Sequence, residues 1–221
     1  MVSDVLENFI SKAGQHIEIL KLEEFGSALF IDSELQVAEK DEKKYSGQFV
    51  GSALNLSKNN SSAAIIGGGD GGVARELSSK GFDLIDWYEL DPEVVKVCQK
   101  HLIKVCGDVK ANNKVKTFWG DAFESIKKVK NAKYDKIFVD LNDDQFCIDL
   151  AAKNMKGLKR ILKPGGIITA QVGCMSKKPR QVKNWLELLK NNFGNVTLDE
   201  VFIPSFDCRW NFASSSNKDN S

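Results

Sequence analysis

The chain has 221 residues, of which 42% are hydrophobic and 28% are charged, so it can bury a core and fold as one domain or as one domain with a small appendage. Its 31 Lys and Arg residues nearly balance its 30 Asp and Glu residues, and the formal net charge of +1 gives no overall electrostatic case for nucleic-acid binding. The first ten residues are acidic where a signal peptide would be basic, and no apolar run reaches the roughly 18 residues that cross a bilayer. We therefore expect a cytoplasmic protein with no nucleic-acid or membrane partner.

The cysteines and histidines are poorly placed to hold a metal ion. No two of the five cysteines form a CxxC pair, and the two histidines, His16 and His101, lie far apart in sequence. We therefore expect no zinc site, and thiols that are reduced and mostly packed. The cysteines are Cys98, Cys106, Cys147, Cys174 and Cys208.

Residues 1–45 are predicted to form a small N-terminal β-domain. The segments 16–22 and 28–31 alternate or run apolar on either side of the turn-prone stretch 25–27 (FGS). This pattern is typical of a short β-hairpin or meander.

Residues 46–215 alternate between short apolar segments and helix-like segments, which predicts an α/β domain with a mostly parallel sheet and helices on both faces. Residues 196–203 and 209–214 flank a Pro-containing turn, and strands so close in sequence can pair only as an antiparallel hairpin. Residues 216–221 belong to a low-complexity tail that we expect to be disordered. The apolar segments are 63–66, 84–90, 115–119, 136–140 and 167–172, and the helix-like segments are 73–80, 92–104, 121–130, 148–162 and 179–192.

The strongest motif is a glycine loop at 67–72 (GGGDGG), which follows an apolar strand and precedes a helix-like segment. Glycine allows positive φ and lets a ligand lie against bare backbone, at the edge of a parallel sheet where such folds bind nucleotides. A strand-to-helix turn without a ligand is the alternative, and five glycines in six positions make it the weaker one. The candidate nucleoside-binding residues of this loop are Gly67, Gly68, Gly69, Asp70 and Gly71.

Acids also end the next two predicted strands. Glu89 lies 22 residues after Gly67, where an acid binds ribose hydroxyls in nucleotide-binding folds; an ordinary solvated acid is the alternative. Asp121 is equally compatible with a hydrogen bond from an adenine amino group and with capping a helix.

Asp70 distinguishes this loop from loops that bind dinucleotides. Pyrophosphate is an anion, so a carboxylate in the middle of the loop argues against a phosphate ligand and favours a cationic one. We therefore expect a nucleoside that carries a positively charged tail.

A set of motifs, in order along nearly the whole chain, resembles the polyamine aminopropyltransferases, which are the spermidine and spermine synthases. The glycine loop with its central aspartate is fairly specific to that family, and the ordered set is more specific still. The segments 98–112 and 201–206 look closer to the spermine synthase branch. The motifs are the glycine loop, residues 89–91 (ELD), residues 120–124 (GDAFE), Tyr134-Asp135 with Val139-Asp140 and Asp143, residues 163–166 (KPGG) and residues 210–214 (WNFAS).

The resemblance implies a Rossmann-like methyltransferase fold with a small N-terminal β-domain, and a homodimer without a metal or a bound prosthetic group. The aminopropyl donor would be decarboxylated S-adenosylmethionine, used as a co-substrate, and the acceptor would be a polyamine. By their positions in the motifs, Leu90 and Ala122 join the residues expected to bind the donor.

The resemblance also implies a catalytic pair. A protonated amine, with a pKa near ~10.4, has no lone pair for the attack on the donor, so a base must take its proton. Asp140, at the end of an apolar strand, would be that base, with Tyr45 or a water as relay; a helix-capping aspartate is the alternative interpretation. The residues expected to bind the acceptor and the donor tail are Gln36, Tyr45, Asp70, Asp140 and Asp143.

The sequence departs from the family pattern where the acceptor would bind. The run 140–145 (DLNDDQ) keeps two spaced acids but lacks the usual proline, and Phe206 stands where relatives commonly have a tyrosine. On these grounds we expect spermidine to be slightly preferred over putrescine.

Two other functions stay open. An S-adenosylmethionine-dependent methyltransferase would use the same sheet and ribose acid, but its donor has a carboxylate in its tail, which Asp70 would repel. A catalytically silent polyamine- or nucleoside-binding homologue is the second alternative, suggested by Phe206 and the short N-terminal region.

Overall fold

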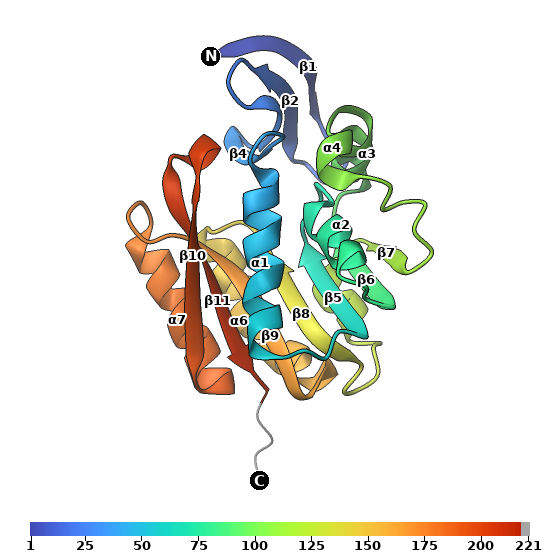
Figure 1. The fold of residues 1–221 in the computed structure, drawn as a ribbon, viewed down its shortest axis with the longest axis vertical. Coiled ribbons are helices and arrows are strands. Elements are labelled where there is room, and N and C mark those ends of the chain that lie inside the picture. Colours follow the sequence, from blue (N-terminus) through green and yellow to red (C-terminus); the bar gives the residue numbers. More distant parts are fainter. Residues whose placement is uncertain (218–221) are drawn as a thin grey trace.

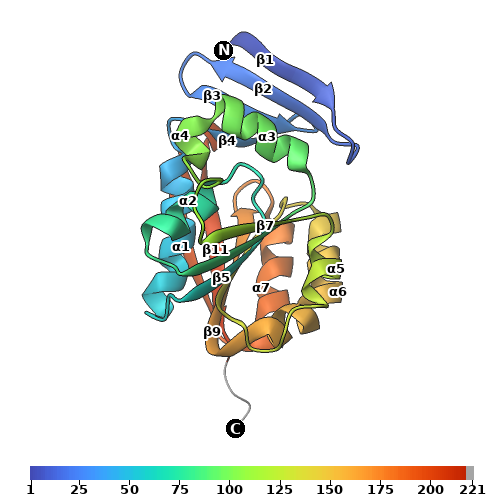
Figure 2. The ribbon, with the colours of Figure 1, turned by 90° about the vertical axis from the view of Figure 1, so that its right-hand side faces the viewer.

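The computed structural model describes residues 1–217, which form two separate β-sheets (Figure 1). The smaller sheet is an antiparallel meander whose strands pair in sequence order. It lies at the top of Figures 1 and 2, beyond the larger sheet. Its strands are β1 (Val2–Ile10), β2 (His16–Leu22), β3 (Gly26–Ile31) and β4 (Glu34–Ala38).

Within the described residues, the larger sheet has seven strands in the order β10-β11-β9-β8-β5-β6-β7. Strands β5 to β9 run parallel, whereas β10 and β11 form an antiparallel hairpin that extends the sheet beyond β9. The central strands β5 and β8 are buried along almost their whole length, as expected for a parallel sheet covered on both faces. The strands are β5 (Ser62–Gly67), β6 (Leu84–Glu89), β7 (Val115–Trp119), β8 (Tyr134–Asp140), β9 (Leu162–Cys174), β10 (Val196–Ile203) and β11 (Cys208–Ser216).

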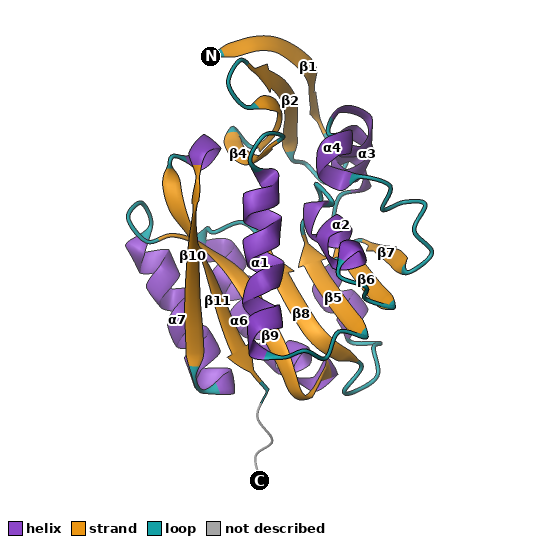
Figure 3. Cartoon of the chain, viewed as in Figure 1, coloured by secondary structure: helices purple, strands orange, loops and turns teal. Residues whose placement is uncertain are grey.

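Helices cover both faces of the larger sheet (Figures 1 and 3). On one face, α1 and α2 contribute Phe49 and Leu77 to a buried apolar cluster. On the other face, α6 and α7 contribute Met155 and Trp185 to a second cluster. The helices are α1 (Glu42–Leu56), α2 (Gly72–Ser79), α3 (Pro92–His101), α4 (Ile103–Cys106), α5 (Ala122–Ile126), α6 (Gln145–Ile161), α7 (Pro179–Phe193) and the short 3₁₀ helix η1 (Pro204–Phe206).

A third apolar cluster joins the N-terminal sheet to the larger domain. Ile17, Ile19 and Leu29 of the small sheet pack with Val94 of α3 and with Leu102, and all five are buried. The small sheet is thereby held against α3, which directly follows β6. Strand β4 then leads into α1, so the N-terminal sheet lies on the side where the parallel strands end (Figure 1).

The predicted fold class is confirmed, because the chain combines a small N-terminal antiparallel sheet, a mostly parallel sheet and a C-terminal antiparallel hairpin. The sequence analysis did not find β1, β4 or α1. Helix α1 has weak amphipathic patterning and contains Gly47 and Gly51, which lower helix propensity. It begins at Glu42, so the predicted domain boundary after residue 45 falls inside a helix.

The end of the chain is more ordered than expected as far as residue 217. Ser216 ends β11, and the backbone N–H of Asn217 donates to the Gly166 carbonyl at 2.8 Å. The rest of the predicted disordered tail, residues 218–221, lies outside the described residues. Among the described helices, none is long and apolar enough to cross a membrane.

Candidate active site

The candidate site lies along one edge of the larger sheet, where parallel strands end side by side. Strand β6 ends at Glu89, β5 at Gly67 and β8 at Asp140, and the neighbouring β9 passes the same edge at Gly173. The carboxyl ends of parallel strands are the usual ligand-binding edge of such sheets. The chain order of the motifs thus becomes a spatial order across β6, β5, β8 and β9.

The glycine loop lies directly against the end of β8. The Gly68 N–H donates to the Asp140 carbonyl at 3.0 Å, and the Trp87 indole N–H donates to the Gly67 carbonyl at 2.8 Å. A Cβ on Gly67 would lie 2.3 Å from the Asp140 carbonyl oxygen, and one on Gly68 would lie 2.8 Å from Asp140 Oδ2. Both glycines also have positive φ, so the loop needs glycine for its shape and for this close approach. Gly71, at φ +81°, precedes α2.

Glu89 lies on the opposite side of the loop. A Cβ on Gly69 would lie 3.2 Å from Glu89 Oε2, and Glu89 Oε1 accepts a 2.9 Å hydrogen bond from the Asp91 N–H. The residue is only 7% exposed, and burial raises the pKa of its carboxyl to about 7. Leu90, by contrast, is 55% exposed. Glu89 Oε2 therefore faces the bare backbone of Gly69. A pair of hydroxyl groups placed there would contact both this oxygen and the Gly69 backbone.

Asp121 and Ala122 mark the end of β7, next to β6. The Asp121 side chain caps α5, accepting from the N–H groups of Phe123 at 2.7 Å and Glu124 at 3.3 Å. Capping, one of the two roles left open, is therefore observed through Oδ1. Gly120 donates to the Glu89 carbonyl at 2.9 Å, so this turn belongs to the same edge.

Asp70 belongs to a group of carboxylates above the start of α2. Asp70 Oδ1 accepts a 2.7 Å hydrogen bond from the Gly72 N–H, and a Cβ on Gly72 would lie 2.3 Å from Glu42 Oε1. Burial raises the pKa of Asp70 well above its usual value, and the charges of Asp140 and Glu42 raise it further. The charge of Arg75, which forms a 2.6 Å ion pair with Glu42, lowers the pKa of Asp70 in part. A bound cation would relieve the remaining repulsion.

Tyr45 and Asp140 form the central contact of the site. Tyr45 lies on α1, and its hydroxyl donates to Asp140 Oδ1 at 2.6 Å. The pKa of the Asp140 carboxyl is raised to about 6. Burial is the main cause and the Glu42 charge adds to it, whereas the hydrogen bond from Tyr45 lowers the pKa. Burial and the Asp140 charge also raise the pKa of Tyr45, so its hydroxyl keeps its proton and remains the donor.

Aromatic side chains hold Tyr45 in this position. Its ring packs edge-on against Phe49, Phe206 and Phe212, with centroids 5.9, 6.3 and 5.1 Å away. Such contacts fix the ring and keep its hydroxyl on Asp140. We call Phe49, Phe206 and Phe212 the aromatic wall of the site. Phe206, which stands where relatives commonly have a tyrosine, is therefore part of this wall.

Asp143 lies one strand further along the edge. Its carboxylate faces the backbone of Gly173 on β9, where a Cβ would lie 2.6 Å from Oδ2. Asp143 also accepts a 3.0 Å ion pair from Lys178, a contact that the sequence analysis did not predict. Asp144, next to it, caps α6 by accepting from the Cys147 N–H at 2.7 Å.

Of the predicted site residues, Gln36 lies on β4 of the N-terminal sheet. Its side-chain amide donates to the Glu34 carbonyl on the same strand, β4, at 3.1 Å. Gln171, which is not among the residues expected to bind a substrate, does contact the site. Its side-chain amide donates to the Leu141 carbonyl, and its side-chain oxygen accepts from the Trp210 indole at 3.1 Å. Gln171 thereby ties the loop after β8 to β9 and β11.

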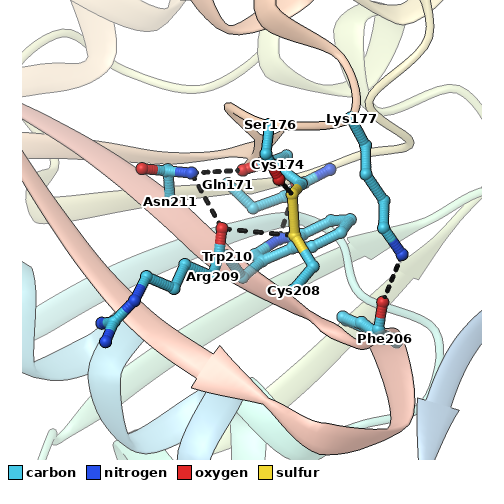
Figure 4. The surroundings of a disulfide bond; sticks show 10 residues. Gln171, Cys174, Ser176, Lys177, Phe206, Cys208, Arg209, Trp210 and Asn211 are labelled. Atoms are coloured by element: carbon cyan, nitrogen blue, oxygen red, sulfur yellow. Dashed lines mark hydrogen bonds between the residues drawn. A yellow bond between two sulfur atoms is a disulfide. The ribbon is translucent and has the colours of Figure 1, made fainter.

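The expectation of reduced thiols was wrong for one pair, because Cys174 and Cys208 form a disulfide (Figure 4). The two residues are separated by 34 positions, but antiparallel pairing of β11 with β9 brings their Cα atoms within 6.4 Å. Spacing in the sequence gives no sign of this pairing. Lys177 donates to the Phe206 carbonyl at 2.7 Å beside it, so the disulfide lies next to the aromatic wall of the site.

Comparison with known proteins gives the same family. The family model described as "Spermine/spermidine synthase domain" matches residues 42–221. A polyamine aminopropyltransferase of Prochlorococcus marinus (strain MIT 9215) is 34% identical over 220 residues, covering 94% of this chain and 76% of that protein. One from Korarchaeum cryptofilum (strain OPF8) is 26% identical over 215 residues, covering 96% of this chain and 67% of that protein.

Solved structures share the fold. A spermidine synthase in complex with the transition-state analogue AdoDATO superposes with a TM-score of 0.91 at 21% identity, covering 98% of this chain and 74% of that one. Spermidine synthase from Thermotoga maritima gives a TM-score of 0.88 at 21% identity, covering 98% of this chain and 73% of that one. The matched domain, the curated relatives and the shared fold together show that this chain belongs to the spermine/spermidine synthase family.

Proposed function

We propose that this chain is a polyamine aminopropyltransferase, which moves the aminopropyl group of decarboxylated S-adenosylmethionine to an amine of a polyamine and releases methylthioadenosine. The observation that carries the proposal is the 2.6 Å contact between Tyr45 and Asp140, directly beside Gly68 and within the field of Asp70. A base, a donor-binding loop and unneutralised carboxylates meet there, as a reaction between two cations requires.

The reaction is a displacement at carbon. The lone pair of the acceptor nitrogen forms a bond to the methylene next to the sulfonium, while the carbon–sulfur bond breaks and its electron pair goes to sulfur. The nitrogen loses one proton, which Asp140 accepts as carboxylate. With a pKa of about 6, Asp140 is mostly ionised at neutral pH and yet a stronger base than an ordinary aspartate. Alignment of the two substrates supplies the rest of the acceleration.

The donor would lie over β6 and β5. Glu89 would bind the ribose hydroxyls against Gly69, while the turn at Asp121 would border the adenine ring of the donor. Asp70 would then face the donor's ammonium tail, near the transferred group. This placement is supported by the order of strand ends across the sheet, and it leaves the β8–β9 side for the acceptor.

A methyltransferase is the alternative within the same fold, and Asp70 distinguishes the two. Calorimetric titration with the decarboxylated and the carboxylated donor tests the choice, with Asp70→Asn as the matched variant. We expect the wild-type chain to bind the decarboxylated donor more tightly and Asp70→Asn to lose much of that preference, because the carboxylate attracts one tail and repels the other. Tighter binding of the carboxylated donor would favour the methyltransferase.

A silent homologue is the other alternative, and the intact contact of Tyr45 with Asp140 weighs against it. The preference for spermidine over putrescine remains a prediction. It is decided by the ratio of kcat/KM for the two amines on the same preparation.

Two further parts of the proposal concern the whole protein. A homodimer is supported by the edge strand β1, which leaves Val2, Val5 and Ile10 exposed on the N-terminal sheet; light scattering of the purified chain tests it. A cytoplasmic location is proposed from the sequence, although a disulfide is uncommon in that compartment. Fluorescence of a tagged chain in cells tests the location.

A further inference from the structure

Lys178 places a cation of the protein itself at the acidic edge of the sheet. Its Nζ lies 3.0 Å from Asp143 Oδ1 and 3.6 Å from Glu34 Oε1. The Lys178 side chain is 33% exposed and that of Asp143 only 9%. Burial lowers the pKa of Lys178, but Asp143 and Glu34 outweigh it and hold the pKa above its usual value. The ammonium therefore stays charged and bridges the N-terminal sheet to the larger sheet.

The carboxylates of the site differ in whether a cation of the protein pairs with them. Among the ion pairs of residues 1–217, Arg75 reaches Glu42 and Lys178 reaches Asp143, whereas Asp70 and Asp140 have no such partner. The carboxylates that face the proposed donor tail and the attacking amine are thus left for ligands. The carboxylate next along the edge is already paired.

The order of the strands tells where a long acceptor would extend. With the donor over β6 and β5 and the reacting nitrogen at Asp140 on β8, the side that the donor does not occupy leads to β9, about 4.8 Å further on. The first carboxylate there is Asp143, against Gly173, and Lys178 lies on it. Each ammonium beyond the attacking nitrogen that extends this way meets a like charge, so an acceptor with two such groups is repelled more than an acceptor with one.

We propose that Lys178 is a specificity-determining residue that disfavours acceptors with an additional ammonium, because its own ammonium occupies the anionic position between Asp143 and Glu34. This inference rests on the proposed aminopropyl transfer. Putrescine carries one ammonium besides the attacking nitrogen, whereas spermidine carries two. Lys178 therefore shifts selectivity toward the diamine, against the direction that the sequence motifs suggest.

The test compares kcat/KM for spermidine and putrescine in the wild-type chain and in Lys178→Met, which keeps an unbranched side chain without the charge. We expect the spermidine-to-putrescine ratio to rise about tenfold, mostly through a lower KM for spermidine, as for one gained charge contact. Lys178→Arg keeps the charge and should keep the wild-type ratio. Lys183→Met removes a charge from an exposed position on α7, the helix that Lys178 precedes, and should leave the ratio unchanged.

An unchanged or lower ratio in Lys178→Met overturns the proposal, and so does an equal rise in Lys183→Met. Thermal unfolding monitors the fold of each variant. If Lys178→Met does not fold, Lys178→Gln, whose amide can still donate to Asp143, provides the same comparison. If the wild-type chain turns over no amine, the proposed function fails. Calorimetric affinities for the two amines, measured with methylthioadenosine bound, then decide the Lys178 inference separately by the same ratio.

Discussion

Replacing Asp140 by asparagine removes a buried charge that destabilises the folded state, so we expect the Asp140→Asn variant to gain stability while it loses activity. Burial raises the pKa of Asp140 from 3.8 to about 6. Between these two pH values the folded chain holds a proton that the unfolded chain has released, so stability falls as pH rises through this window. The destabilisation is complete above it and amounts to about 3 kcal/mol.

Asparagine avoids this cost and still accepts the hydrogen bond from Tyr45. At pH 7 the variant should therefore unfold about 6–12 °C above the wild-type chain, and at pH 4 the gain should shrink to under about 1 kcal/mol. Turnover should fall at least ~100-fold, because the amine loses its base. Donor affinity should change little, since Glu89 and the glycine loop are untouched.

Thermal unfolding at pH 4 and pH 7, with turnover and donor titration on the same samples, checks the reasoning. Asp144→Asn is the matched control, because asparagine caps a helix about as well as aspartate and this residue is next to Asp143 in the same loop. Equal loss of donor binding and turnover would make Asp140 a structural residue. A lower unfolding temperature at pH 7 would refute the argument from its raised pKa.

Three other variants test separate parts of the site. Tyr45→Phe removes the hydrogen bond that lowers the pKa of Asp140, so the acidic limb of kcat/KM should move to higher pH and turnover at pH 7 should fall about tenfold; a limb that stays in place would deny the contact a role. Glu89→Gln should weaken binding of the donor by about 1.5–3 kcal/mol, and an unchanged Kd of the donor would show that Glu89 does not bind the ribose. Cys208→Ser opens a loop of 34 residues and should lower the free energy of unfolding by about 4 kcal/mol in urea titrations, unlike Cys147→Ser, which changes a free thiol. Equal stability of the wild-type chain with and without reductant would argue against the disulfide.

The fold could be predicted largely because its parallel strands and helices carry clear periodic patterns. The segments at 115–119 and 196–203 correspond to β7 and β10 with the predicted bounds. Helix α1 was missed because its weak pattern gives no such signal, although it carries Tyr45. A helix that packs on the sheet through a few aromatic side chains is recognised from its tertiary contacts, which sequence periodicity does not contain.

The candidate site divides in the same way. Gly67, Glu89 and Asp140 each end a strand, so their meeting at one edge follows from the parallel topology that the sequence predicts. Lys178 and Glu34 come from segments without a motif: Lys178 reaches Asp143 from the turn before α7, and the packing of the small sheet brings Glu34 to Lys178. A basic residue just before a helix gives no sign in sequence that it will face an acid.

The most direct test of the account is turnover with identification of both products. The chain is incubated with decarboxylated S-adenosylmethionine and, in parallel, putrescine, spermidine and spermine, and methylthioadenosine and polyamines are measured by mass spectrometry. We predict one methylthioadenosine for each amine that gains one aminopropyl group, and a loss of both products in Asp140→Asn. Absence of product with every amine, from a folded chain that binds the donor, would contradict the account.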